Sequence, residues 1–123
     1  MKHILKRHTI SFKNAFTGLI WVLQTQPNYK IHLVISLLVI IGGIYYRLVY
    51  VEWLTIAILI TMGLVIETIN TALEVTTDAI DTRWRQDIKT AKDVSAAAML
   101  IFAFGSFVIA IIIFVPKILL IFN

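Results

Sequence analysis

The sequence contains no cysteine, and only two prolines and five glycines among its 123 residues. Without cysteine, disulfides, thiolate metal sites and cysteine nucleophiles are excluded. Charged residues are also scarce, at 15% of the chain, whereas 59% of the residues are hydrophobic. This composition is typical of a membrane protein, and the length leaves room for about three spans.

Several familiar motifs are missing as well. The chain has no Walker lysine loop, no glycine-rich dinucleotide turn and no soluble-kinase signature. No apolar run occurs before Ile31, so a cleaved signal peptide is not expected. The three histidines (His3, His8 and His32) lack ligand-like spacing, and we expect them at the membrane interface rather than on a metal. Repeats and domain linkers are also absent, so residues 1–123 are expected to form one domain.

Long apolar segments dominate what is present. We expect an all-α membrane protein with spanning helices over 28–46, 53–81 and 92–115, the last ending at Pro116. The second would be roughly 40 Å long, so its last turns should project beyond the hydrocarbon. Pro27 suits the first turn of the first span.

Residues 10–25 show the pattern of a surface helix. Their apolar side chains share one arc, with basic residues nearby, as in helices that lie in the membrane interface. The alternative is an amphipathic helix on a soluble core, although the rest of the chain offers no such core. Basic residues cluster before the first span and between the second and third. The positive-inside rule therefore predicts a cytoplasmic N-terminus and a C-terminus outside.

A stripe of polar residues marks the second expected span. At about 100° per residue, its members fall within an arc of roughly 80°. They are Glu67, Asn70, Glu74, Asp78 and Asp81. Carboxylates in or beside a bilayer cost about 2.5–3.5 kcal/mol each at its centre, so they usually face a protein interior and serve a function.

The stripe supports more than one interpretation. Its oxygens can hold a divalent cation and leave one carboxylate as a base. Alternatively, the polar face merely seals an oligomer interface, or Glu67 couples an ion to transport. Because three helices enclose little interior, we expect one chain to be unable to shield the stripe and expect self-association. Three alanines at 96–98 would permit close helix approach.

One run of residues carries a resemblance. The segment 67–78 matches E-x-x-N-T-A-[IL]-E-x-x-x-D, and Ala91-Lys92-Asp93 follows it. Both motifs resemble those of the prokaryotic diacylglycerol/undecaprenol kinase family, and the resemblance covers nearly the whole chain. It implies a small homotrimer in the cell membrane of a prokaryote, with active sites between subunits. Such proteins transfer the γ-phosphate of Mg-ATP to a lipid alcohol.

The resemblance also implies functions for single residues. Glu67 matches the catalytic base, and Glu74 matches a Mg²⁺ ligand. Nucleotide contacts are implied for Asn70, Glu74, Lys92 and Asp93. Asp78 matches a motif acid, and Arg7 matches an arginine of the surface helix.

Two positions depart from the family pattern. The segment 25–32 resembles T-E-x-N-[FY]-x-x-H, but Gln26 stands where the family has a metal-binding Glu. An amide oxygen can coordinate Mg²⁺ but contributes no charge. The run Arg83-Trp84-Arg85-Gln86 replaces a more usual E-Y-H-x, which either strengthens phosphate contacts or marks a divergent nucleotide site.

An active kinase is our main hypothesis; the rivals are a non-catalytic kinase-like lipid- or nucleotide-binding protein and a small ion-coupled transporter. The T-x-x-N-Y-x-x-H pattern favours undecaprenol over diacylglycerol.

Overall fold

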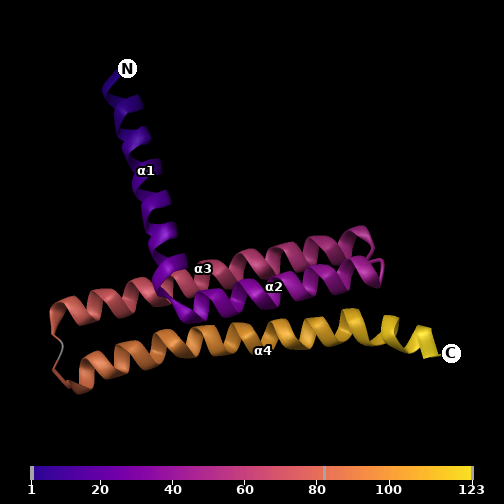
Figure 1. Cartoon of the computed structure of the whole chain (residues 1–123). Coiled ribbons are helices and arrows are strands. Elements are labelled where there is room, and N and C mark those ends of the chain that lie inside the picture. Colours follow the sequence, from indigo (N-terminus) through magenta and orange to yellow (C-terminus); the bar gives the residue numbers. More distant parts are fainter. Residues whose placement is uncertain (1, 82, 123) are drawn as a thin grey trace.

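The computed structural model describes residues 2–81 and 83–122, with the side chains of 10–81 and 83–120. It is all-helical, as predicted, and its helices are α1 (Lys2–Thr25), α2 (Pro27–Tyr45), α3 (Tyr50–Ile80) and α4 (Gln86–Phe122). Helix α3 runs antiparallel to both α2 and α4, whereas α1 leaves the bundle at a steep angle (Figure 1). Within the described residues, three helical segments are long and apolar enough to cross a membrane: Pro27–Tyr45, Tyr50–Ile80 and Gln86–Leu120.

Three of the helices, α1, α3 and α4, are longer than the expected ones, whereas α2 has the expected length of 19 residues. Helix α1 begins at Lys2 rather than at residue 10, and α4 begins at Gln86 rather than at residue 92. The expectation that the last span ends at Pro116 is wrong, because α4 continues through this proline to Phe122. Proline removes one backbone donor but is tolerated in membrane helices. Just beyond it, the Lys117 Nζ lies 2.9 Å from the Glu52 Oε2 and holds α4 against the start of α3.

Helix α3 is the central element of the bundle. It packs against α4 along its length and against α2. A hydrophobic core of Leu48, Ile56 and Ile113 lies near the turn between α2 and α3, with Trp53 and Phe114 packed around it. The core therefore fixes one end of the bundle, and the polar stripe of α3 lies toward the other end.

The turn between α2 and α3 is closed by a Schellman motif. The Leu48 N–H donates to the Gly43 carbonyl at 3.0 Å, and the Arg47 N–H donates to the Ile44 carbonyl at 3.2 Å. Arg47 occupies the left-handed position of this motif with φ of 53°, where glycine is usual. The motif aims Leu48 back at Gly43, and this side chain forms part of the core.

Helices α3 and α4 extend further than α2 at the end where α1 joins (Figure 1). The 31 residues of α3 span about 46 Å, whereas the 19 residues of α2 span about 28 Å. Only the latter length matches a hydrocarbon core of about 30 Å. The last turns of α3 and the first turns of α4 thus form a two-helix extension beyond the membrane-spanning part.

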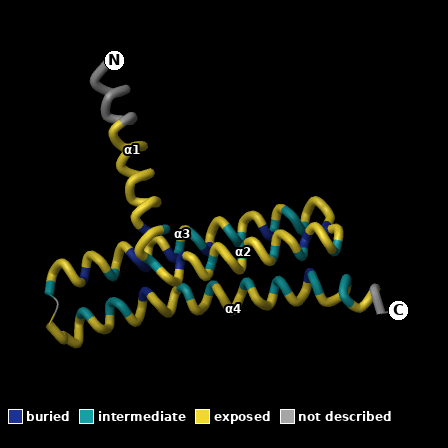
Figure 2. The backbone as a smooth tube through the Cα atoms, in the orientation of Figure 1, coloured by how far each residue is buried: buried dark blue, intermediate teal, exposed yellow. Residues whose placement is uncertain are grey.

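The outer faces of the bundle are apolar. Exposed positions predominate along α2, α3 and α4 (Figure 2), and residues such as Leu100, Ile101 and Phe104 are each at least 70% exposed. A soluble monomer rarely exposes so much contiguous apolar surface. Lipid chains or further copies of the chain must cover these faces.

We expect Gly43→Ala to lower the thermal stability of the protein in detergent. A Cβ at this position would lie 2.8 Å from the Trp53 ring and 2.9 Å from the Leu48 side chain. Overpacking of this kind costs about 1–3 kcal/mol, which exceeds the gain in helix propensity of about 1 kcal/mol. The neighbouring Gly42→Ala is the control, because its Cβ would meet only the Phe114 ring at 3.4 Å. Equal melting temperatures for the two variants would contradict this packing.

Candidate active site

A polar pocket of about 360 Å³ opens where the spans end near α1. It is formed by α2, α3 and α4. Its lining comprises Asn28, Ile31, His32, Glu67, Asn70, Glu74, Ala96, Met99, Leu100 and Ala103. The structure therefore brings Glu67, Asn70 and Glu74 of the predicted stripe into one pocket, and α2 contributes a further wall.

Glu67 is the most deeply buried acid of the pocket. The residue is only 3% exposed, and its Oε2 lies 4.0 Å from the His32 Nε2 on α2. The expectation that one chain cannot shield the stripe is wrong for Glu67 and for Asn70, which is 6% exposed. Packing of α2 and α4 on both sides of α3 supplies the walls, since the side chains of His32 and Met99 line the same pocket.

A chain of hydrogen bonds fixes Asn70. The Ser95 hydroxyl on α4 donates to the Asn70 Oδ1 at 2.6 Å, and the Asn70 Nδ2 donates to the Glu74 Oε1 at 3.1 Å. Both Ser95 and Asn70 are buried. The amide is thereby oriented with its donor toward Glu74, and it holds one carboxylate oxygen in a fixed place.

Beyond the pocket, ion pairs continue along the two-helix extension. The Lys92 Nζ contacts the Asp78 Oδ1 at 2.5 Å and joins α4 to α3. Asp93 instead pairs with Lys89 within α4. Both pairs are partly exposed, and such pairs contribute at most about 1 kcal/mol. Lys92 can therefore exchange Asp78 for another anion at little cost.

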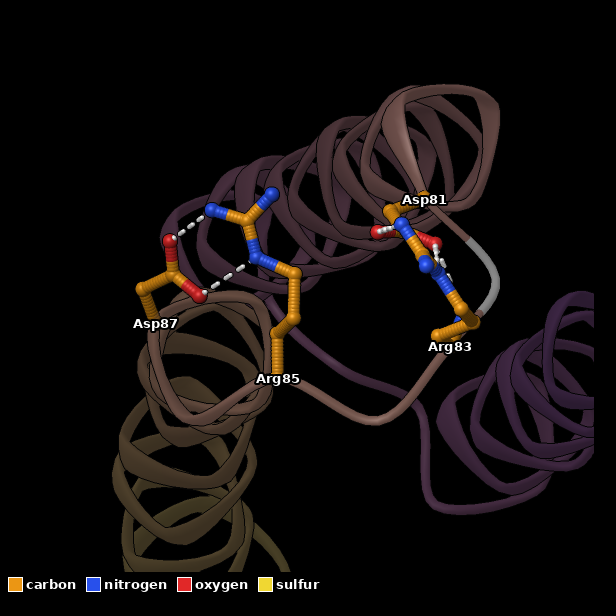
Figure 3. A network of polar contacts seen from close by, with 4 residues as sticks. All are labelled: Asp81, Arg83, Arg85 and Asp87. Atoms are coloured by element: carbon orange, nitrogen blue, oxygen red, sulfur yellow. Dashed lines mark hydrogen bonds and ion pairs between the residues drawn. The ribbon is translucent and has the colours of Figure 1, made fainter.

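The loop between α3 and α4 holds two further ion pairs (Figure 3). The Arg83 guanidinium forms two hydrogen bonds with Asp81, at 3.1 and 3.0 Å, and Arg85 pairs in the same way with Asp87. The hydrogen bonds from Arg83 lower the pKa of Asp81 below its usual value. Each arginine of the divergent loop therefore already has an acidic partner two residues away.

One predicted site residue lies outside this arrangement, and a second cannot be placed from the described side chains. Gln26 is the N-cap residue of α2, and its amide donates to the Thr25 hydroxyl at 3.3 Å rather than lining the polar pocket. Arg7 belongs to α1, but its side chain lies outside the described residues. Within one chain, the structure thus does not bring Gln26 into the pocket of Glu67 and Glu74.

The donor set of the pocket suits a hard cation that brings some ligands of its own. Among the described residues, no group of three or more His, Asp or Glu side chains is close enough to hold a metal ion alone. The pocket offers the carboxylates of Glu67 and Glu74 and two amide oxygens, those of Asn28 and Asn70. Mg²⁺ is commonly bound by one or two carboxylates together with substrate phosphates. The residues present fit that mode of binding.

Three residues of the site were not predicted as such. Asn28 and His32 both line the pocket, and their places in the T-x-x-N-Y-x-x-H pattern could have identified them. His32 was expected at the membrane interface rather than on a metal, and in the structure its Nε2 faces Glu67. Ser95 carried no signal, because its partner on α3 is 25 residues away in sequence.

These features define a class of protein: a small multi-pass helical membrane protein with a buried carboxylate, that of Glu67, at the end of its spans. The family model for prokaryotic diacylglycerol kinase matches residues 13–114. The chain is 35% identical to the undecaprenol kinase of Bacillus subtilis over 113 residues, which cover 92% of each chain. It is also 28% identical to the diacylglycerol kinase of a Synechocystis strain over 114 residues, which cover 89% of this chain and 63% of that protein.

The chain belongs to the prokaryotic diacylglycerol kinase family. It is a membrane lipid kinase, as the motif resemblance predicts, and the ion-coupled transporter hypothesis is discarded. Membership also accounts for the position of the site, since a lipid kinase must bring a water-soluble nucleotide and a membrane lipid to one plane.

We expect Ser95→Ala to destabilise the protein by about 1–3 kcal/mol, because the buried Asn70 Oδ1 would lose its donor from α4. Thermal unfolding in detergent measures the loss. Thr90→Ala on the same helix is the control, since the Thr90 hydroxyl is exposed and bonds only the backbone carbonyl of Gln86. If both variants unfold at the same temperature, the Ser95–Asn70 hydrogen bond does not hold α4 to α3.

Proposed function

We propose that this kinase transfers the γ-phosphate of Mg-ATP to the terminal hydroxyl of undecaprenol in the cell membrane of a prokaryote. The observation that carries the proposal is the place of Glu67. It is a buried carboxylate in the polar pocket, directly beside residues that continue into the apolar spans.

In the proposed reaction, the oxygen of the lipid hydroxyl attacks the γ-phosphorus in line with the leaving group. The bond between the γ-phosphorus and the bridging oxygen of ADP breaks, and Glu67 accepts the hydroxyl proton. A general base of this kind contributes about 10²–10⁴-fold to the rate. His32 lies against the same carboxylate, so it limits the positions that Glu67 can adopt.

The remaining site residues bind the nucleotide. Glu74, held by Asn70, is the proposed protein ligand of Mg²⁺, and the cation would neutralise phosphate charge. Lys92 would exchange its partner Asp78 for a phosphate, with Asp93 beside it. Lys92 bonds Asp78, which follows Glu67 by eleven residues, about 16 Å along α3. We retain Gln26 as a weak, uncharged metal ligand and Arg7 as a contact of the surface helix.

Undecaprenol is the favoured acceptor, with diacylglycerol as the alternative. The relative that is 35% identical over nearly its full length is an undecaprenol kinase, and the T-x-x-N-Y-x-x-H pattern points the same way. Phosphate transfer from radiolabelled ATP to each lipid in vesicles distinguishes the two. Transfer to diacylglycerol alone would overturn this choice.

The site is proposed to face the cytoplasm, where ATP is available. Nine basic residues lie in α1, at the start of α2, or around the loop between α3 and α4, and these parts share one end of the bundle (Figure 1). They are Lys2, Lys6, Arg7, Lys13, Lys30, Arg83, Arg85, Lys89 and Lys92. The remaining two, Arg47 and Lys117, lie at the opposite end. By the positive-inside rule, the C-terminus would then lie outside.

A homotrimer with sites shared between subunits is the proposed assembly. The exposed apolar faces of α2–α4 need cover, and residues 96–98 are small and exposed on α4, which permits close helix approach. Glu74 is only partly covered within one chain. A neighbouring subunit would therefore complete the metal-binding side of the pocket.

We expect Glu67→Gln to reduce phosphate transfer by about 10²–10⁴-fold while the protein stays folded, because the amide keeps the size of the side chain but accepts no proton. Initial rates with Mg-ATP and undecaprenol in vesicles measure this loss. Glu52→Gln makes the same chemical change on the same helix at the far end, beside Lys117, and should keep the wild-type rate. Wild-type turnover by folded Glu67→Gln would remove the base assignment.

The shared site predicts complementation between two inactive variants. Glu67→Gln and Lys92→Ala subunits are unfolded together and refolded at several ratios. If one site uses Glu67 of one subunit and Lys92 of another, mixed trimers should regain up to about a quarter of the wild-type rate, because random mixing leaves some sites with both native residues. A mixture that stays inactive at every ratio would place both residues of each site in a single chain.

A further inference from the structure

A second cavity lies deeper in the spans than the polar pocket. It measures about 340 Å³ and lies between α2, α3 and α4. Its wall is almost wholly apolar, with residues such as Val39, Ile60, Phe102 and Ala110. Because the lining positions follow one another along all three helices, the cavity is an elongated groove parallel to the spans.

The groove joins the polar pocket. Three residues, His32, Met99 and Ala103, line both cavities. From Met99 to Ala110 the groove follows α4 for eleven residues, about 16 Å. One of its ends therefore lies at the His32–Glu67 contact, and the other lies within the membrane-spanning part of the bundle.

We propose that this groove holds the first part of the substrate's hydrocarbon chain and accepts one chain only. The inference rests on the proposed function and extends it to the lipid class: an alcohol with a single apolar chain, such as a polyprenol, rather than a two-chain glyceride. A groove that begins at Glu67 and runs into apolar surroundings presents the hydroxyl at the base while its chain stays in hydrocarbon. Its volume accommodates roughly ten carbon-sized groups, each close to a water molecule in size; the rest of a long chain extends into the bilayer.

The occupant is a lipid chain rather than a helix of another copy. A groove of this volume is far too small for a helix, whose diameter with side chains is about 10–12 Å. The only polar side chains of its lining are His32, Ser36 and Ser106. The Ser36 hydroxyl donates to the backbone carbonyl of His32 on its own helix, and the buried Ser106 hydroxyl has no partner among the described residues. A single unpaired hydroxyl offers too little to bind a polar ligand, so the groove suits a hydrocarbon.

A lipid chain in the groove would promote the reaction by orienting the hydroxyl toward Glu67. A lipid chain that leaves the bilayer for the groove exchanges one apolar medium for another, so the hydrophobic effect contributes little. What the groove supplies is a fixed approach of the hydroxyl to Glu67, and a misplacement of about 1 Å can cost a hundredfold in rate. Filling the far end of the groove should therefore impair long alcohols and spare those too short to reach it.

Photolabelling tests the location directly and needs no turnover. A farnesol analogue with a diazirine on its last isoprene unit is irradiated with the wild-type protein in vesicles, and the labelled residues are found by mass spectrometry. We expect labels on groove residues between Phe102 and Ala110 and on Ile56 or Ile60, and strong competition by unlabelled farnesol but not by dioleoylglycerol. Labels confined to outward-facing residues such as Ile101 or Ile112 would overturn the proposal, and so would equal competition by dioleoylglycerol.

Kinetics with a filled groove complete the test. Ala110→Phe should lower kcat/KM about tenfold or more for farnesol and leave it unchanged for prenol, the one-isoprene alcohol. Ile112→Phe adds bulk at the same depth on the exposed side of α4 and should leave both values unchanged. An equal loss of kcat/KM for both alcohols with Ala110→Phe would count against the groove. If the phenylalanine ring prevents folding, Ala110→Leu repeats the test with a smaller side chain. Groove labelling without any phosphate transfer would refute the proposed function alone; transfer with only outward labels would refute the groove alone.

Discussion

Burial of a carboxylate within a thin bundle is the constraint on which the rest of the structure depends. Glu67 is nearly inaccessible, although most other residues of this thin bundle are exposed. An acid within the membrane usually faces the interior of the protein. Helix α3 therefore occupies the centre, with α2 bringing His32 and α4 bringing Ser95 to its polar face. At the opposite end of the bundle, Trp53 and Leu48 pack closely on Gly43, which has no side chain. This contact keeps α2 and α3 in the register that the burial of Glu67 needs.

Much of the architecture follows from hydropathy alone. The three spans and the polar stripe of α3 could be predicted because a period of 3.6 residues and long apolar runs are local properties of a sequence. The ends of the helices were harder to predict from the sequence. In water, a proline such as Pro116 usually ends a helix, but in an apolar setting the backbone groups beyond it can only form hydrogen bonds within the helix, so α4 continues. The shielding of Glu67 was misjudged because it depends on how α2 and α4 settle against α3, which no single segment encodes.

The site shows the same division. Glu67, Asn70 and Glu74 were identified from one helix face and a matching motif, and they do share a pocket. His32 and Asn28 enter it from another helix, so only the packing of α2 on α3 reveals them. Ser95 could not be predicted from the sequence at all. A serine beside three alanines looks like a small residue for close helix packing, and only the structure shows that its hydroxyl donates a hydrogen bond to the Asn70 side chain. The sequence left open whether the loop arginines strengthen phosphate contacts or mark a divergent nucleotide site, and only the structure shows that each is paired with a nearby aspartate.

The two-helix extension beyond α2 divides the molecule into two parts with different constraints on their sequence. The extension carries the Lys92–Asp78 ion pair between α3 and α4 alone, whereas Glu67 lies in a pocket lined by all three helices. Sequence drift in the extension leaves the packing around the acid undisturbed. Within this architecture, the loop between α3 and α4 can change while the packing of α2, α3 and α4 around Glu67 keeps its shape. Related chains should therefore vary their loops far more freely than the helix face that carries Glu67.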